Sequence, residues 1–140
     1  MVKDALVSSI MSKDVVTLRF KDDLETAEHL FKHHKIRHIP VVENGILKGM
    51  LSYTDLLRIS FADAFGEDEM SVDSVVYNMF TIKQVMVKNV VTMPSTSTVK
   101  EIADMLSHKE FHAIPIVDNG RLVGIVTSTD LIRFLLKQLS

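Results

Sequence analysis

The apolar positions of this chain follow a pattern that occurs twice. A set with three-to-four spacing predicts a helix with one buried face. The same set returns 75 residues later, as Leu24, Ala27, Leu30 and Phe31 and then Val99, Ile102, Met105 and Leu106. Met11 matches Met86 at the same offset, since 86 − 11 = 75. The match runs without a gap from Val7–Ile59 to Ile82–Phe134, so we interpret the chain as an internal duplication.

Short β-branched runs predict three strands in each repeat. In the first repeat these runs are Val15–Leu18, Ile39–Glu43 and Leu47–Leu51. Asn44-Gly45 separates the last two, and both residues tolerate positive φ, so the pair predicts a tight hairpin. Asn119-Gly120 holds the matching place in the second repeat.

Polar residues mark the helix starts. Asp22 with Glu25, and Thr98 with Glu101, have the spacing of a capping box, in which side chains satisfy free amides of the first turn. A further helix is expected from Ser52 to about Ser60. Each repeat therefore reads strand, helix, strand, strand, helix, which predicts an α+β fold of duplicated β-α-β-β-α units.

The repeats divide the chain into a first unit at 1–60, a linker at 61–81 and a second unit at 82–140. A unit of about 50 residues buries little apolar surface alone, so we expect the two to pack together around a pseudo-twofold axis. Met70–Phe80 reads as a helix within the linker. It is interpreted as a packed connector, with a partner-facing helix as the alternative because methionine and phenylalanine are adaptable apolar groups.

The composition argues against several classes of function. The 140 residues carry a formal net charge of −2 without a long basic run, which argues against nucleic-acid binding. Cysteine is absent, which excludes disulfides, thiolate metal sites and cysteine nucleophiles. We find no signal-peptide pattern and no apolar run long enough for a membrane helix, so a cytoplasmic protein is expected.

Six short motifs, in the same order in both repeats, carry a family resemblance. In the first repeat they include Val16-Thr17, Ile39-Pro40-Val41-Val42, and the Gly49–Asp55 stretch that follows the Asn-Gly turn. Each repeat resembles a CBS (cystathionine-β-synthase-type) domain, so the chain looks like a stand-alone Bateman module. In that family two units pair, pairs often form homodimers, and adenosine-containing ligands bind between the units of a pair.

The resemblance implies two ligand-binding sets, each shared between the units. Set A consists of Val16, Thr17, Ile36, Arg37, His38, Ile39, Pro40, Thr127 and Asp130. Set B consists of Val91, Thr92, Phe111, His112, Ala113, Ile114, Pro115, Ser52 and Asp55. The implied ligand is an adenine nucleotide (AMP, ADP, ATP or a related adenosyl compound), with or without Mg²⁺, and no cofactor is obligatory.

Physical chemistry supports these roles. Ser52-x-x-Asp55 and Thr127-x-x-Asp130 sit where a strand feeds a helix, whose free amides suit a phosphate, while a carboxylate can accept from ribose hydroxyls. The same spacing is also that of a plain helix cap. A proline cannot donate to a sheet, so we expect the chain before Pro40 and before Pro115 to leave the ladder and expose its backbone to an adenine edge.

The two sets differ in charge. Set A holds Arg37, whose guanidinium is a fork for phosphate oxygens. Set B holds Phe111, which could stack on a purine. The alternatives are that Arg37 is merely solvated and that Phe111 is merely core.

The histidines and the absence of enzyme motifs complete the sequence picture. His29 and His33, like His108 and His112, are four apart, a spacing that can bind zinc when a third ligand is near. A hydrated helix face is favoured, and no metal site is predicted. No nucleophile-elbow, Walker or zinc-protease pattern occurs, so no catalysis is expected.

Three functions compete. The favoured one is a regulatory module that binds adenine nucleotides and signals to an unidentified target protein. The others are a ligand-free interaction module and a metal-responsive protein. A homodimer is expected through the apolar residues of the last helix of each repeat, namely Leu56, Leu57, Ile59, Leu131, Ile132, Phe134 and Leu135.

Overall fold

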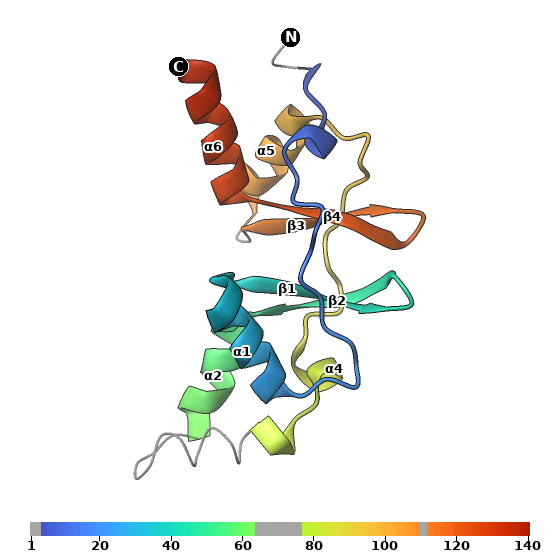
Figure 1. Cartoon of the computed structure of the whole chain (residues 1–140), viewed down its shortest axis with the longest axis vertical. Coiled ribbons are helices and arrows are strands. Elements are labelled where there is room, and N and C mark those ends of the chain that lie inside the picture. Colours follow the sequence, from blue (N-terminus) through green and yellow to red (C-terminus); the bar gives the residue numbers. More distant parts are fainter. Residues whose placement is uncertain (1–3, 64–76, 110–111) are drawn as a thin grey trace. The chain divides into compact units, whose positions relative to one another are not determined.

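The computed structural model describes residues 4–63, 77–109 and 112–140 (Figure 1). The labelled elements in chain order are η2 (Val7–Ser9), α1 (Leu24–His34), β1 (His38–Glu43), β2 (Ile46–Ser52), α2 (Tyr53–Asp63), α4 (Ile82–Val85), α5 (Val99–His108), β3 (Ala113–Asp118), β4 (Arg121–Thr127) and α6 (Ser128–Leu139). Both halves thus combine a strand pair with helices, and the predicted α+β class is confirmed.

The chain forms two compact units that are not consecutive in sequence. Unit 1 comprises Met1–Val15 with Val90–Ser140, and unit 2 comprises Val16–Asn89. The segment leading each repeat therefore packs with the hairpin of the other repeat. In unit 1, Ser12 bridges Ile125, and in unit 2, Val87 bridges Met50. The division predicted from the sequence follows the order of the repeats along the chain, with units at 1–60 and 82–140 and a linker at 61–81. It remains a prediction.

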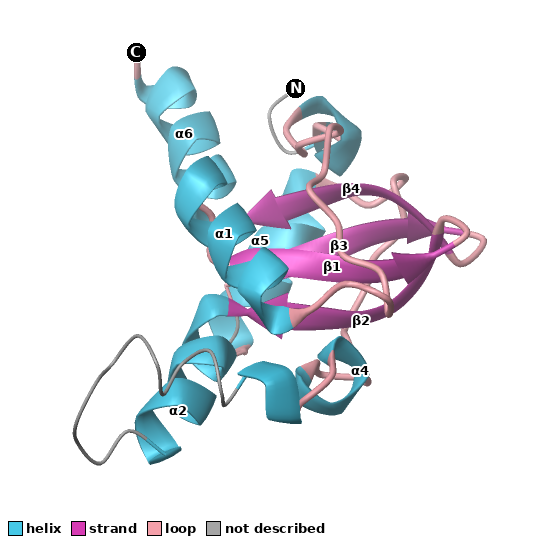
Figure 2. Cartoon of the chain, turned by 60° about the horizontal axis from the view of Figure 1, so that its bottom comes forward, coloured by secondary structure: helices cyan, strands magenta, loops and turns pink. Residues whose placement is uncertain are grey.

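Each unit is built around one antiparallel hairpin, as the Asn-Gly pairs predict. Asn44 and Gly45 have φ of 53° and 81°, and Asn119 and Gly120 have φ of 54° and 81°. Both central residues thus adopt the left-handed conformation of a two-residue hairpin turn. Figure 2 shows the hairpins, β1 with β2 and β3 with β4, as strand pairs joined by tight loops.

The predicted first strand of each repeat shrinks to a single bridge. Val15–Leu18 does not form a strand, and only Leu18 pairs, in parallel with Val41. In the second repeat Met93 pairs with Ile116 in the same way. The prediction of a full strand was therefore wrong.

One predicted helix cap is confirmed and one is displaced. Thr98 and Glu101 form the full capping box at the start of α5. At α1 the capping residue is Asp23, whose side chain accepts from the Thr26 amide at 2.8 Å. Asp22 instead accepts from the Arg19 amide at 2.7 Å, so the expected Asp22–Glu25 box is wrong by one residue. Both aspartates are good capping residues, and the sequence alone does not rank them.

Each unit has its own apolar core beneath its hairpin. In unit 2 the core joins Leu18, Phe31 and Leu51 to Ile82 and Met86, which come from the segment leading the other repeat. In unit 1 it joins Val7 to Ile102, Ile114, Ile116 and Val126. The α1 and α2 helices contact one another in unit 2, as α5 and α6 do in unit 1.

Most of the predicted linker helix Met70–Phe80 lies outside the described residues. Its end is described: Tyr77 is buried and its hydroxyl hydrogen-bonds to the Glu28 carboxylate of α1. Met79 and Phe80 are 66% and 37% exposed. The described end of the linker is thus tied to α1 through Tyr77.

Three hydrogen-bonded carboxylates make stability depend on acid pH. The Ser95 hydroxyl, at 2.6 Å, and then the Ser95 amide, at 3.0 Å, hold the pKa of Asp118 below its ordinary value. The side chain and amide of Thr26 lower the pKa of Asp23, and the amide and hydroxyl of Thr98 lower that of Glu101. A depressed folded pKa gives stability that is present above the unfolded value of about 4 and lost as pH falls through the folded value.

We therefore expect urea unfolding midpoints to fall as the pH drops below about 4. Ser95→Ala removes the hydroxyl that contributes most to the Asp118 shift. This variant should be less stable at neutral pH and should lose less stability on acidification. An acid slope identical to that of the wild type would show that the Ser95–Asp118 contact does not contribute to it.

Candidate ligand-binding residues

The carboxylate of Asp130 belongs to a complete helix cap at the start of α6. Its Oδ2 accepts from the Thr127 amide at 2.9 Å and from the Thr127 hydroxyl at 3.1 Å. In return, Thr127 Oγ1 accepts from the Asp130 amide at 3.3 Å. The capping interpretation of Thr-x-x-Asp is thus realised. All three bonds use Oδ2 or the main chain, so Asp130 Oδ1 makes no hydrogen bond among the described residues.

The matching pair in unit 2 is built differently. Ser52 Oγ accepts from the Asp55 amide at 3.0 Å, while Asp55 Oδ1 pairs with Arg58 at 3.3 Å. Arg58 was not among the predicted site residues, although its spacing of three residues after Asp55 places the two on one helix face. Asp55 must therefore share its charge with Arg58, so the two predicted ribose acceptors are not equivalent.

The prolines of both sets lie inside strands, which corrects one expectation. Pro40 pairs with Met50, and the ladder continues before it through Ile39 to His38 opposite Ser52. Pro115 pairs with Ile125 in the same way. The chain before each proline therefore stays in the hairpin, because the missing N–H is directed away from the hairpin partner.

The missing N–H of Pro40 lies on the side of β1 that faces the segment containing Val16 and Leu18. Leu18 N donates to the Pro40 carbonyl, and Val42 N donates to the Leu18 carbonyl, each at 2.9 Å. The next rung of a parallel ladder would run from residue 40 to the Val16 carbonyl, and proline has no N–H to donate. No backbone hydrogen bond from the described residues reaches that oxygen.

The second repeat shows the same interruption. Met93 N donates to the Pro115 carbonyl at 3.3 Å and Val117 N to the Met93 carbonyl at 3.0 Å, so Val91 loses its rung. This explains why each predicted first strand is one bridge long. It also leaves the carbonyls of Val16 and Val91 without a backbone hydrogen bond from the described residues.

Within each unit, the residue three before the proline contacts the start of the helix that follows the hairpin. Tyr53 N donates to the Arg37 carbonyl at 2.9 Å, and Ser128 N donates to the His112 carbonyl at 3.0 Å. The Ser128 hydroxyl also lies 3.5 Å from His112 Nδ1. These bonds bring Arg37 beside the Ser52–Asp55 turn and His112 beside the Thr127–Asp130 turn. Tyr53 and Ser128 were not foreseen, because the contact depends on the hairpin register.

The residues of sets A and B differ in how far their side chains are exposed. Arg37, Thr92 and His112 are exposed, whereas Ile39, Pro40, Ala113, Ile114 and Pro115 are buried. Val16, Thr17, Ile36, His38, Ser52, Asp55, Thr127 and Asp130 are half-buried, and Val91 is 38% exposed. Phe111 lies outside the described residues. Sets A and B each draw on both units, and their composition stays a prediction.

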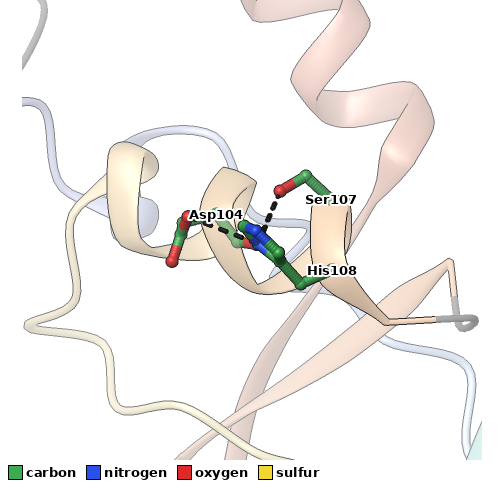
Figure 3. A network of polar contacts seen from close by, with 3 residues as sticks. All are labelled: Asp104, Ser107 and His108. Atoms are coloured by element: carbon green, nitrogen blue, oxygen red, sulfur yellow. Dashed lines mark hydrogen bonds and ion pairs between the residues drawn. The ribbon is translucent and has the colours of Figure 1, made fainter.

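The described residues contain no group of three or more His, Asp or Glu side chains arranged to hold a metal ion. One polar network occurs at the end of α5, where His108 Nδ1 lies 2.9 Å from the Asp104 carbonyl and 3.0 Å from Ser107 Oγ (Figure 3). All three residues are exposed. Among the described helices, none is long and apolar enough to cross a membrane.

Comparison with known proteins identifies the family. The CBS domain model matches residues 7–62 and 82–137. A CBS domain-containing protein of Dictyostelium discoideum is 31% identical over 136 residues, which cover 96% of this chain and 93% of that protein. Some relatives are enzymes, but the chain covers only 24% of one of them, a homoserine O-acetyltransferase of Methanohalobium evestigatum.

Solved structures with the same fold include ligand complexes. The CBS domain pair of protein MJ0100, in complex with 5′-methylthioadenosine and S-adenosyl-L-methionine, is 28% identical with a TM-score of 0.76, and the match covers 96% of this chain and 98% of that one. CBSX2 of Arabidopsis thaliana, in complex with AMP, has a TM-score of 0.80 at 19% identity, with 97% and 99% covered. The family match over both repeats shows that the chain belongs to the CBS domain family, as a tandem pair of CBS domains.

Proposed function

We propose that this chain is a regulatory module that binds an adenosyl ligand and performs no chemistry itself. The observation that carries the proposal recurs in both units. The proline leaves a carbonyl of the neighbouring segment without its backbone hydrogen bond, and the chain just before the proline contacts a Ser/Thr-x-x-Asp helix start. The likeness to the MJ0100 domain pair, which was solved with two adenosyl compounds, supports the ligand class. The full-length match to a CBS domain-containing protein supports a module that works without an attached enzyme.

Each chemical group of the ligand has a matching group in the chain. The open backbone of Val16-Thr17 and Val91-Thr92 suits the hydrogen-bonding edge of adenine. A carboxylate that already accepts from its own helix cap can accept from ribose hydroxyls with its second oxygen. Arg37 adds a permanent positive charge for phosphate. The joining of Thr17 and Arg37 with Asp130 in one site is part of the proposal.

Calorimetric titration tests the ligand and the role of Arg37 together. We expect the wild-type chain to bind at least one of AMP, ADP, ATP, 5′-methylthioadenosine and S-adenosylmethionine. Arg37→Ala should weaken ATP binding more than adenosine binding, because only ATP offers phosphates to the guanidinium. Arg37→Lys keeps the charge and should be intermediate. If no adenine compound binds at millimolar concentration, the regulatory proposal fails.

A second function, a ligand-free interaction module, is favoured by the exposed apolar face of α6. No residue of α6 is buried. Ile132, Leu135, Leu136 and Leu139 are 58%, 56%, 59% and 74% exposed, and Leu57 on α2 is 49% exposed. By contrast, Leu56 is fully buried and Leu131 packs against the unit 1 core, so these two predicted interface residues serve their own unit.

We expect this face to hold two copies together, because exposed leucine rows on a helix gain free energy when covered. Light scattering of the wild type should give a mass well above the 15.8 kDa of one chain. Leu135→Glu should shift the mass toward one chain, whereas Gln138→Glu on the same helix should not. A wild-type mass near 15.8 kDa at micromolar concentration would contradict the dimer.

A further inference from the structure

Two histidines lie side by side on the exposed surface of α1. His29 and His33 are four residues apart, and their ring centroids are 5.6 Å apart with planes inclined by 14°. Both side chains are exposed. Within the described part of the chain, no hydrogen bond occupies a ring nitrogen of either residue; His33 has only one further ring contact, with His34 at 4.8 Å. Both imidazoles can therefore turn a nitrogen toward a common partner.

The spacing of the two rings suits a bridging metal ion. Metal–nitrogen bonds of 2.0–2.1 Å and a tetrahedral angle place the centroids of two coordinating imidazoles about 5 Å apart. The observed separation is within about 1 Å of that distance. The nearly parallel planes must rotate so that both lone pairs reach one ion, and the χ2 torsion of an exposed histidine has a broad, shallow energy profile. The backbone of α1 need not move.

The charges around the pair favour a cation. His33 lies in the last turn of α1, where the partial negative charge of the helix end stabilises positive groups. The neighbouring Lys32 ammonium is neutralised by Glu28 at 3.1 Å. The Glu28 carboxylate also accepts the Tyr77 hydroxyl, so it is held close to α1. An ion bound by the two imidazoles would therefore meet limited repulsion.

The duplicated position in α5 provides an internal contrast. Asp104 and His108 are the counterparts of His29 and His33 at the 75-residue offset. There, His108 Nδ1 lies near the Asp104 carbonyl and Ser107 Oγ, and the Asp104 carboxylate lies 3.5 Å away (Figure 3). One nitrogen of His108 is thus engaged within its own helix. Only α1 offers two imidazoles without such engagement among the described residues.

We infer that His29 and His33 together bind a divalent transition-metal ion of the imidazole-preferring class, such as Zn²⁺, with water completing its coordination. The sequence favoured a hydrated helix face at these positions, and it is the placement of the two rings that changes the assignment. The site uses none of the residues in sets A and B. It therefore stands independently of the proposed adenosyl ligand.

Titration of the untagged full chain with Zn²⁺ in a non-coordinating buffer at pH 7.5 tests this site. We expect saturable binding by the wild type. His29→Gln and His33→Gln should each lower the affinity for Zn²⁺ about a hundredfold. The single remaining imidazole then lacks the second ligand that the helix holds beside it. His34→Gln and His108→Gln should leave it unchanged. These positions are exposed, so circular dichroism should confirm that every variant keeps its fold.

A second measurement uses Cu²⁺ as a spectroscopic probe. Its paramagnetic resonance spectrum should show two nitrogen ligands in the wild type and one in His29→Gln. Acidification should release the ion, since imidazole must be neutral to coordinate. The inference is overturned if Zn²⁺ does not bind, or if it binds equally well to His29→Gln. Loss of binding in His34→Gln alone would overturn it as well.

Discussion

Gly49→Ala should destabilise the chain by about 1–3 kcal/mol, which is the usual cost of forcing an extra carbon into a packed site. A Cβ at this position would lie 2.5 Å from Met86 Sδ and 2.7 Å from the Val87 carbonyl oxygen. The sulfur can swing aside, but the carbonyl belongs to the segment that bridges β2 through Met50. The added carbon would push that backbone away from the hairpin.

Gly124→Ala is the matched substitution in the other repeat and should cost less. Its Cβ would lie 2.6 Å from Met11 Sδ, and the nearest backbone atom, the Ser12 carbonyl oxygen, is 3.0 Å away. Urea unfolding of both variants measures the difference. Double-mutant cycles then separate the causes, because shortening the methionine removes the clash with sulfur and leaves the clash with the backbone.

Met11→Ala should recover most of the loss in the Gly124→Ala background. Met86→Ala should recover little in the Gly49→Ala background, since the Val87 carbonyl remains in place. Equal costs for the two glycine substitutions, or full recovery with Met86→Ala, would show that the backbone approach at Gly49 does not limit the site.

Asp130→Ala should lower the affinity for the adenosyl ligand about tenfold to a hundredfold. A hydrogen bond to a charged group is worth about 1.5–3 kcal/mol, and the carboxylate is the proposed ribose acceptor. The same substitution removes the capping box of α6, so the melting temperature should fall as well. Calorimetric titration at a temperature well below the transition separates the loss of affinity from the loss of stability.

Glu101→Ala is the matched control because Glu101 closes an equivalent capping box at α5 and belongs to neither ligand set. It should lower the melting temperature and leave ligand affinity unchanged. Asp55→Ala should affect ligand binding less than Asp130→Ala, since Asp55 already pairs with Arg58. If Asp130→Ala and Glu101→Ala bind the ligand equally well, Asp130 serves only as a helix cap.

The local elements were predictable because their signals are local. The Asn-Gly pairs specify hairpin turns through their tolerance of positive φ, and both turns have that geometry. Thr98 and Glu101 specify a helix start through side chains that reach only their own first turn. The ungapped offset between the repeats identified the duplication and carried the family resemblance, which the comparisons confirm.

The properties that depend on which segments meet were not accessible to the same reasoning. The β-branched run Val15–Leu18 predicted a strand, but the length of a strand depends on its neighbour, and Pro40 opposite it cannot supply the next hydrogen bond. The exchange of leading segments between the repeats, which places Met86 against Gly49, is likewise invisible in a linear pattern.

The sequence by itself therefore determined the duplicated α+β architecture, the turns, the capping box at α5 and the residue types available for a ligand. The tertiary structure decided which carbonyls the prolines leave open and which backbone segment approaches Gly49. The physical reason is that turns and caps are satisfied within a few residues. Hydrogen-bond rungs and close approaches of backbone are instead set by a partner that lies far away along the chain.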